Sequence, residues 1–261
     1  MDCKDFNWVF SSASPAGQYL KYIDEENKYY YKLSDYSCGR FTSNESVMEV
    51  IASRVGRLLG LPVLRYTGEM SNVMLDNKVH TTFVAKSKNF VPSTSSSMPL
   101  HLFYQLNKLE KEQPYNFMVR MGWKEYVDAL FVFDYLIIGV DRHGRNVEII
   151  VSNNGVSKPA PIFDNGRSFT FEYGTNKVLL EKFDYTADFQ ANNFIGGISL
   201  ERNLNYVDTV FRVPSLTDCF KRRVFYGLKY VLTEEHIELL WSIINYRYGL
   251  LKEKGIFNEV V

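Results

Sequence analysis

The sequence predicts an α+β protein of two lobes, with a small strand-rich amino-terminal lobe and a mainly helical carboxy-terminal lobe. Three observations support this prediction. Residues 19–33 and 63–85 contain short runs rich in aromatic and β-branched side chains, as strands do. Residues 123–138 and 233–251 are longer, and their apolar side chains recur at helical spacing. Between these two halves, residues 91–99 are rich in Pro and Ser, which is typical of a loop.

Most of the first half is expected to form a sheet. Strands are predicted at residues 19–23, 28–33, 63–69, 72–75 and 79–85. The polar residues 24–27 lie between the first two runs, so these runs are expected to pair as a hairpin.

One helix is expected within this strand-rich half. Thr42 and Glu45 have the spacing of a capping box, which predicts the start of the helix. Gly60 stands where a carboxy-terminal cap is expected, and Pro62 follows it. The apolar positions between them recur at helical spacing: Val47, Val50, Ile51, Val55, Leu58 and Leu59.

Composition and charge exclude several classes of protein. The chain has 261 residues, of which 46% are hydrophobic and 23% charged, so a folded core is expected. Its formal net charge is zero, which gives no support for binding nucleic acid or membranes by charge alone. Cys3, Cys38 and Cys219 are too widely spaced to suggest a zinc site or a disulfide framework. With no signal peptide or long apolar run in view, we expect a soluble cytoplasmic protein.

The segment that carries chemistry begins at Asp141, directly after the apolar helix predicted at 123–138. Asn146 follows Asp141 by five residues, and a predicted hairpin then leads to Asp164. The hairpin consists of strands at 147–151 and 159–163, joined by an Asn-Asn-Gly turn. It is expected to fold back and bring Asp164 to the loop that holds Asp141.

Phosphoryl transfer requires this set of groups. One carboxylate orients or deprotonates the attacking hydroxyl, and hard oxygen ligands hold Mg²⁺ on the nucleotide phosphates. The interpretation makes Asp141 the base, with Asn146 and Asp164 as the metal ligands. An Asp and an Asn five residues apart more often form a turn or a helix cap. The order of helix, loop, hairpin and second Asp makes the pattern more specific.

At this point the sequence resembles the HipA-like serine/threonine kinases. The residues that carry the resemblance are Asp-Arg-His-Gly-Arg-Asn at 141–146 and Ala-Pro-Ile-Phe-Asp-Asn-Gly-Arg-Ser at 160–168. The resemblance implies a two-lobed protein-kinase-like fold, with residues 1–90 as the nucleotide-binding lobe and residues 91–261 as the helical lobe. It also implies ATP and Mg²⁺ as cofactors and a protein Ser/Thr hydroxyl as acceptor. Some members of the family are toxins with an antitoxin partner.

The resemblance extends to the small lobe. Lys32 matches the strand lysine that contacts the nucleotide phosphates, and Glu49 matches the helix glutamate that pairs with this lysine. A solvated surface position is the alternative for each of them. Lys86 and His143 are further candidates for contacting the nucleotide.

Three neighbours of the predicted site have structural interpretations. His143 has no other His or Cys at ligand spacing, so a hydrogen bond that orients the loop is expected of it. Arg142 is expected either to support the loop or to neutralise charge near the site. Asp134 lies on the apolar helix, and because an unpaired buried charge is costly, it is expected to bond the catalytic loop.

The predicted phosphate loop departs from the family pattern. Residues 10–17 precede the first strand and contain one glycine, Gly17, so a Gly-x-Gly-x-x-Gly motif is absent from them. Ser11, Ser12 and Ser14 and the backbone amides are candidates for contacting phosphates. HipA-like kinases phosphorylate a serine in this loop, and any of the three serines is a candidate for that modification. A plain amino-terminal turn is the alternative.

Other functions remain open at the level of sequence. Phosphatidylinositol-type lipid kinases and small-molecule kinases use a similar loop for the same chemistry. The chain has no basic amphipathic helix to favour a lipid substrate. An inactive kinase fold that serves as a binding module is the third alternative, favoured by the unusual serine-rich loop.

Overall fold

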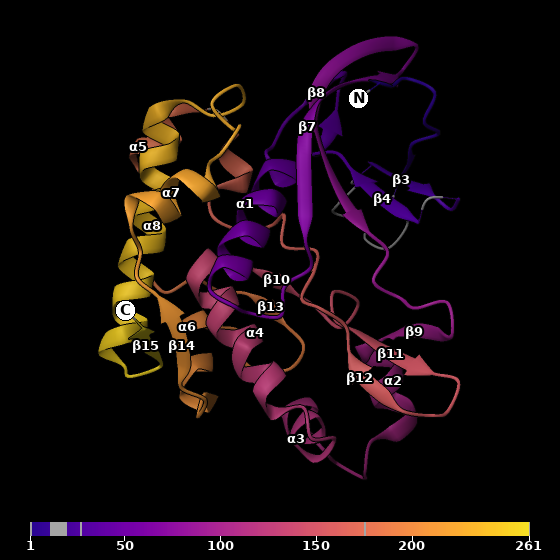
Figure 1. The fold of residues 1–261 in the computed structure, drawn as a ribbon, viewed down its shortest axis with the longest axis vertical. Coiled ribbons are helices and arrows are strands. Elements are labelled where there is room, and N and C mark those ends of the chain that lie inside the picture. The colour runs from indigo at the N-terminus through magenta and orange to yellow at the C-terminus, as the bar shows by residue number, and fades with distance from the viewer. Residues whose placement is uncertain (1, 11–19, 27, 175, 261) are drawn as a thin grey trace.

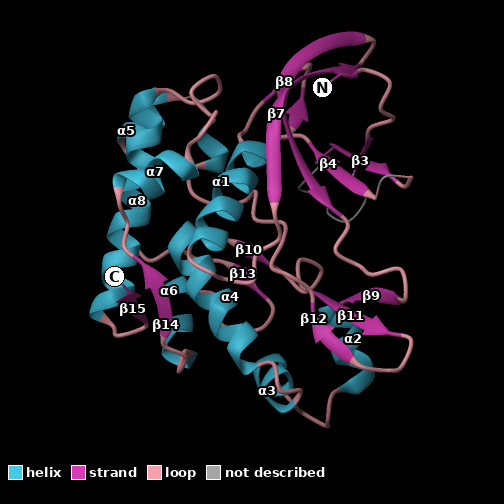
Figure 2. Ribbon diagram, in the orientation of Figure 1, coloured by secondary structure: helices cyan, strands magenta, loops and turns pink. Residues whose placement is uncertain are grey.

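The structure is a computed structural model that describes residues 2–10, 20–26, 28–174 and 176–260. It confirms the predicted α+β class and its two lobes (Figures 1 and 2). The large sheet and one helix form the lobe that holds the amino terminus, and most of the helices lie in the other lobe. The lobe boundary between residues 90 and 91 stays a prediction.

A mostly antiparallel sheet forms the small lobe, with strand order β1-β7-β8-β4-β3-β2. Its strands are β1 (Asp2–Cys3), β2 (Val9–Phe10), β3 (Leu20–Asp24), β4 (Tyr29–Lys32), β7 (Tyr66–Leu75) and β8 (Lys78–Lys88). The short strands β5 (Tyr36–Ser37) and β6 (Arg40–Phe41) pair beside the sheet. The predicted hairpin is β3 and β4, and residue 19 of the first predicted strand lies outside the described residues.

Two strand predictions in this lobe were wrong. The strands predicted at 63–69 and 72–75 are one strand, β7, which pairs with β8 along its whole length. Met70 and Ser71 pair with Phe83 and Thr82 of β8, so the gap left between the two predicted strands does not interrupt the strand. Val63 lies outside β7 and forms an isolated parallel bridge with Ile162.

Helix α1 (Glu45–Leu58) is the predicted helix of the small lobe, but its amino-terminal cap is different. The cap residue is Asn44, so the capping box predicted from Thr42 was wrong. Glu45 is occupied elsewhere, because its carboxylate accepts hydrogen bonds from the Asp35 amide at 3.2 Å and from the Ser43 hydroxyl. The predicted end is confirmed: Gly60 has φ +77°, and its amide donates to the carbonyl of Arg57.

The large lobe holds the remaining described α-helices. They are α2 (Leu100–Asn107), α3 (Pro114–Arg120), α4 (Lys124–Ile137), α5 (Lys177–Glu181), α6 (Leu200–Asn203), α7 (Asp218–Val224) and α8 (Glu234–Glu253). Helices α4 and α8 confirm the two long helices predicted from apolar spacing. The Thr233 hydroxyl caps α8 by accepting from the His236 amide. Two 3₁₀ turns, η1 (Phe171–Tyr173) and η2 (Leu204–Tyr206), complete the helical segments.

The strands of the large lobe are short. They are β9 (Ser95–Pro99), β10 (Asp141–Arg142), β11 (Glu148–Ser152), β12 (Ser157–Pro159), β13 (Asn192–Asn193), β14 (Phe211–Pro214) and β15 (Phe257–Val260). The strand predicted at 147–151 is β11. The strand predicted at 159–163 was misplaced, because β12 begins earlier and ends at Pro159. The loop predicted at 91–99 was partly wrong, because β9 pairs with β11.

The larger of two hydrophobic clusters spans both lobes, and in it α1 packs against strands β7 and β8 on one side and large-lobe residues on the other. Gly56 permits this approach: a Cβ atom there would stand 2.4 Å from Cγ2 of Val63 and 2.8 Å from Cε2 of Phe133. Helix α1 is therefore held between the sheet and the large lobe (Figure 1). Within the described residues, no helix is both long and apolar enough to cross a membrane.

Candidate active site

The central feature of the candidate site is a buried lysine with two carboxylates. Nζ of Lys32, on β4, lies 3.2 Å from Oε2 of Glu49 on α1 and 2.7 Å from Oδ1 of Asp164. The Lys32 side chain is 12% exposed and that of Glu49 is 2% exposed, so water screens these ion pairs weakly. The structure thus brings together three predicted residues from a strand, a helix and a loop.

The charges in this cluster shift one another's pKa values. Burial lowers the pKa of Lys32, but Asp164 and Glu49 outweigh it and hold that pKa well above the usual value. Burial raises the pKa of Glu49, and Lys32 offsets this only in part. Burial also raises the pKa of Asp164, but the positive charges of Lys32 and Lys21 outweigh burial and hold this pKa below the usual range. Asp164 is therefore a carboxylate at neutral pH.

The backbone of Asp164 is unusual. Its φ of +57° lies in the left-handed region, which non-glycine residues seldom adopt. Two residues later, a Cβ atom at Gly166 would stand 3.0 Å from the carbonyl oxygen of Glu45, so glycine permits the chain to pass close to the start of α1. Strained backbone of this kind clusters at functional sites.

Asp141 and Asn146 lie in the loop that follows α4. The side-chain amide of Asn146 donates to the Asp141 carbonyl at 2.8 Å, which closes the loop and leaves the Asn146 amide oxygen without a partner among the described residues. Nη1 of Arg167 donates to Oδ2 of Asp141 at 3.3 Å. Strand β10 pairs with β13, which fixes Asp141 beside Asn192.

Arg142 joins the loop 141–146 to the segment that carries Asp164. Its side chain is 2% exposed and forms two charge-assisted bonds with Asp134 of α4, at 2.7 and 3.1 Å. It also donates to the carbonyl of Phe163 at 2.8 Å and to Oδ1 of Asn165 at 2.8 Å. The expectation that Asp134 bonds this loop is confirmed, and Arg142 supports the loop.

Asn165 extends this network to the small lobe, and the sequence interpretation missed it. Its backbone amide donates to Oε1 of Glu49 at 2.8 Å. Glu49 therefore holds Lys32 with one oxygen and the amide of Asn165 with the other. Lys21 was also missed, although it stands opposite Lys32 in the β3–β4 register and its charge acts on Asp164. The predicted hairpin placed Lys21 on the strand next to that of Lys32, and this was the sequence feature that pointed to it.

The remaining residues predicted to contact the nucleotide do not all lie at this cluster. Nε2 of His143 lies 3.9 Å from Oδ1 of Asp141, and its Nδ1 accepts from the Arg145 amide at 3.3 Å, which orients the loop as expected. Lys86 stands opposite Tyr31 in the register, so it faces the other side of the sheet from Lys32. Its Nζ lies 4.0 Å from the centre of the Tyr29 ring. Ser11, Ser12, Ser14 and Gly17 lie outside the described residues.

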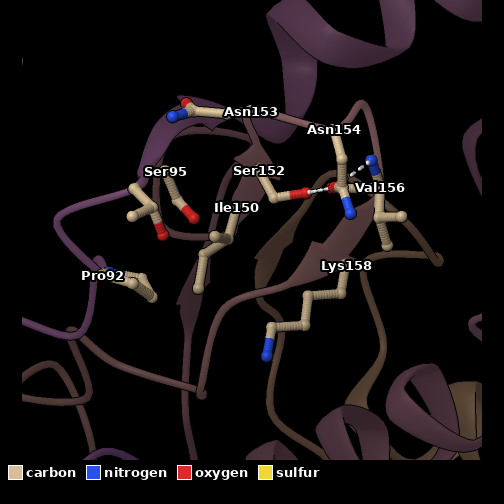
Figure 3. Close-up of a pocket in the computed structure, with 9 residues that line it drawn as sticks. Pro92, Ser95, Ile150, Ser152, Asn153, Asn154, Val156 and Lys158 are labelled. Carbon is tan, nitrogen blue, oxygen red and sulfur yellow. Dashed lines mark hydrogen bonds between the residues drawn. The ribbon is translucent and has the colours of Figure 1, made fainter.

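A separate pocket of about 580 Å³ lies on the sheet formed by β9, β11 and β12 (Figure 3). Figure 3 shows Asn154 at its rim, bonded to the Ser152 hydroxyl and the Val156 amide, while Lys158 extends along it. Lys158 is the charged side chain of its lining. None of the predicted site residues lines this pocket.

The donor set at the candidate site fits a hard cation. Asp164 supplies a charged carboxylate whose Oδ2 has no partner among the described residues, and Asn146 supplies a neutral amide oxygen. Carboxylate and amide oxygens are ligands that Mg²⁺ accepts, and Mg²⁺ usually keeps several waters and takes phosphate oxygens as well. Among the described residues there is no cluster of three or more His, Cys, Asp or Glu side chains suited to a metal.

Comparison with known proteins supports the fold. No protein-family model matches the chain, and no curated protein matches it. Among solved structures, the fold is similar to the crystal structure of a Helicobacter pylori proinflammatory kinase, CtkA, with a TM-score of 0.61. The match covers 98% of this chain and 97% of that chain at 16% sequence identity. The chain therefore has a two-lobed kinase-like fold.

Proposed function

We propose that this chain is an ATP- and Mg²⁺-dependent phosphotransferase, and that it is a HipA-like protein serine/threonine kinase. One observation carries the proposal: Lys32 is paired with Glu49 and with Asp164, so the small-lobe strand, helix α1 and the segment after the hairpin meet at one point. Kinases need a lysine for the nucleotide phosphates and a carboxylate for the metal at such a point.

Each residue of the site has a role in this proposal. Asp141 receives or orients the proton of the attacking hydroxyl, and Arg167 holds its carboxylate in place. Lys32 neutralises the nucleotide phosphates, while Glu49 positions Lys32. Asp164 and Asn146 would hold Mg²⁺, which when bound neutralises negative charge on the phosphates. Arg142 positions the two loops relative to each other.

The metal ligands are tested by calorimetry of ATP binding with and without Mg²⁺. Asp164→Ala and Asn146→Ala should both reduce the increase in affinity that Mg²⁺ gives, and Asp164→Ala should reduce it more, because a carboxylate contributes a full charge. Glu181→Ala, which removes an exposed carboxylate on α5, is the control. If both site variants keep the full metal dependence of ATP affinity, these residues are not the ligands.

The acceptor is tested separately from the nucleotide site. We propose a Ser or Thr hydroxyl on a protein, and a serine among Ser11, Ser12 and Ser14 as a site of self-phosphorylation. A phosphate there would add about −1.5 to −2 charges. Placed beside the nucleotide, it would inhibit the enzyme by repulsion. Incubation with Mg·ATP, followed by intact mass and peptide mapping, should locate one added phosphate in this loop. Transfer only to inositol lipids or to metabolites would contradict the protein-kinase assignment.

A further inference from the structure

A second basic site lies away from the candidate active site, between α1 and α7. A cavity of about 390 Å³ is lined by Arg54 of α1, by Cys219, Arg222 and Arg223 of α7, and by Tyr226 just after α7. Three guanidinium groups from two elements therefore line one hollow. In Figure 1, α1 and α7 lie side by side, and residues of the two helices are in contact.

The charge of this cavity is unbalanced. Within the part of the chain that the structure describes, no carboxylate lies within 4.0 Å of the guanidinium nitrogens of Arg54, Arg222 or Arg223. The neighbouring lysine of α7 differs, because Lys221 is paired with Glu238. Asp218 lies one turn before Arg222 on the same helix and is not paired with it. Unpaired cations around one hollow attract an anion.

Arg54 is held in place within this cavity. Its Nη1 donates to the carbonyls of Val224 and Tyr226, both at 2.8 Å, so the backbone after α7 fixes the guanidinium group. Its Nε and Nη2 have no hydrogen-bond partner among the described residues and remain available to a ligand. Arg222 and Arg223 are exposed, and so add charge and donors that adapt to the ligand.

We propose that this cavity binds the phosphate of a phosphorylated serine or threonine on a protein segment. A single carboxylate carries one negative charge and has two oxygens, too few to match three arginines. A phosphate dianion carries two charges and has three acceptor oxygens, so it matches the three guanidinium groups better. Tyr226 is 79% exposed at the cavity, and Tyr230 in the same loop is 88% exposed. Exposed tyrosines of this kind contribute rigid contact area to a peptide chain that flanks the phosphate.

The position of the cavity gives the bound phosphate a structural consequence. Arg54 follows Glu49 by five residues on α1, which places it about 140° around the helix and about 7.5 Å along it. Glu49 on one face of α1 thus pairs with Lys32, while Arg54 on another face of the helix points to α7. A phosphate bound by Arg54 together with Arg222 and Arg223 ties α1 to the large lobe.

Fluorescence anisotropy with labelled peptides tests the proposal. The probe is a peptide pool with a central phosphoserine and degenerate flanks, compared with matched pools that carry Ser or Glu at that position. A saturating non-hydrolysable ATP analogue with Mg²⁺ is present to occupy the proposed nucleotide site. The assay requires no phosphoryl transfer, so its result is independent of the proposed function. The phosphoserine pool should bind, and its affinity should fall with added salt.

The variant Arg222→Ala/Arg223→Ala should weaken binding of the phosphoserine pool by about tenfold or more, since it removes two charged donors. The matched control, Arg202→Ala/Arg212→Ala, removes two exposed arginines outside the cavity and should change affinity by less than about twofold. Equal binding of the Glu pool or of the Ser pool overturns the proposal. So does equal binding by both double variants, or inorganic phosphate that binds as tightly as the phosphoserine pool.

Discussion

At the scale of single residues, the site depends on buried charges that satisfy one another. Arg142 shows this most clearly, because Asp134 holds its pKa above the ordinary value despite complete burial. Its hydrogen bonds reach three segments: α4, the loop 141–146 and the segment 163–165. The pairing therefore determines where Asp141 and Asp164 stand relative to each other.

Removing one partner of this pair should be costly. Arg142→Met leaves Asp134 buried without its counter-charge, so the free energy of unfolding should fall by about 3–5 kcal/mol. The double variant Asp134→Leu/Arg142→Met should lose less than the sum of the two single variants, by about 0.5–3 kcal/mol. Urea unfolding of all four proteins measures this coupling. Strict additivity would show that the pair does not act as a unit.

Buried His236 should make the stability of the protein depend on pH. It is 2% exposed on α8, its ring bonds the Thr170 hydroxyl at 2.8 Å, and burial lowers its pKa to about 4. The unfolded chain therefore binds a proton at this residue below pH 6.5, while the folded chain does not until near pH 4. The contribution of His236 to the free energy of unfolding is fully present above pH 6.5. It is lost as the pH drops towards 4, by about 3 kcal/mol in total.

The measurement is the free energy of unfolding at several pH values between these limits. His236→Gln removes the titrating group, so the variant should lose less stability than the wild type over the same range. The variant is expected to start from a lower stability at neutral pH, since the bond with Thr170 changes. The same pH dependence in both proteins would rule out His236 as its source.

At the scale of elements, periodicity predicted the long helices and the main hairpin but not the pairing of weak segments. The serine-rich residues 95–99 have low strand propensity and form β9 only because β11 supplies backbone partners. Helices α2 and α3 were missed for a related reason: they are short and depend on packing of residues such as Leu100 and Phe117. The segments that carry Asp141, Asn146 and Asp164 were recognisable from sequence, because an apolar helix, a loop and a hairpin follow one another there. The chemical roles of these three residues stay predictions.

The close packing of α1 gives an element-scale test with a matched pair of glycines. Gly56 and Gly249 both lie inside helices, so Gly→Ala gains about 0.5–1 kcal/mol of backbone free energy at each. A Cβ atom at Gly249 meets nothing within 4 Å, whereas at Gly56 it meets Val63 and Phe133. Gly249→Ala should stabilise the protein, and Gly56→Ala should destabilise it by about 1–3 kcal/mol. Thermal or urea unfolding compares them, and similar effects of both would contradict tight packing of α1.

At the scale of the whole molecule, α1 connects what happens in the two lobes. It carries Glu49 towards Lys32 and Asn165, packs on the large lobe at Gly56, and presents Arg54 to α7. The bond of Asn165 with Glu49 and the action of the Lys21 charge on Asp164 arise only when the sheet, α1 and the segment after the hairpin come together, so sequence alone does not predict them. The predicted hairpin placed Lys21 and Lys32 only on neighbouring strands. Local patterns suggested the candidate groups, and tertiary packing determined their partners.

The most direct test of the proposed phosphotransferase activity is transfer of the γ-phosphate of labelled ATP, in the presence of Mg²⁺, by the wild type and by Asp141→Ala. The wild type should phosphorylate a protein hydroxyl, whether its own or that of an added protein. Asp141→Ala should bind ATP as the wild type does and lose transfer by about a hundredfold or more. Near-wild-type transfer by Asp141→Ala would contradict the assignment of the base. If the wild type binds ATP tightly but transfers phosphate to no acceptor, the proposal that this chain is a phosphotransferase is contradicted.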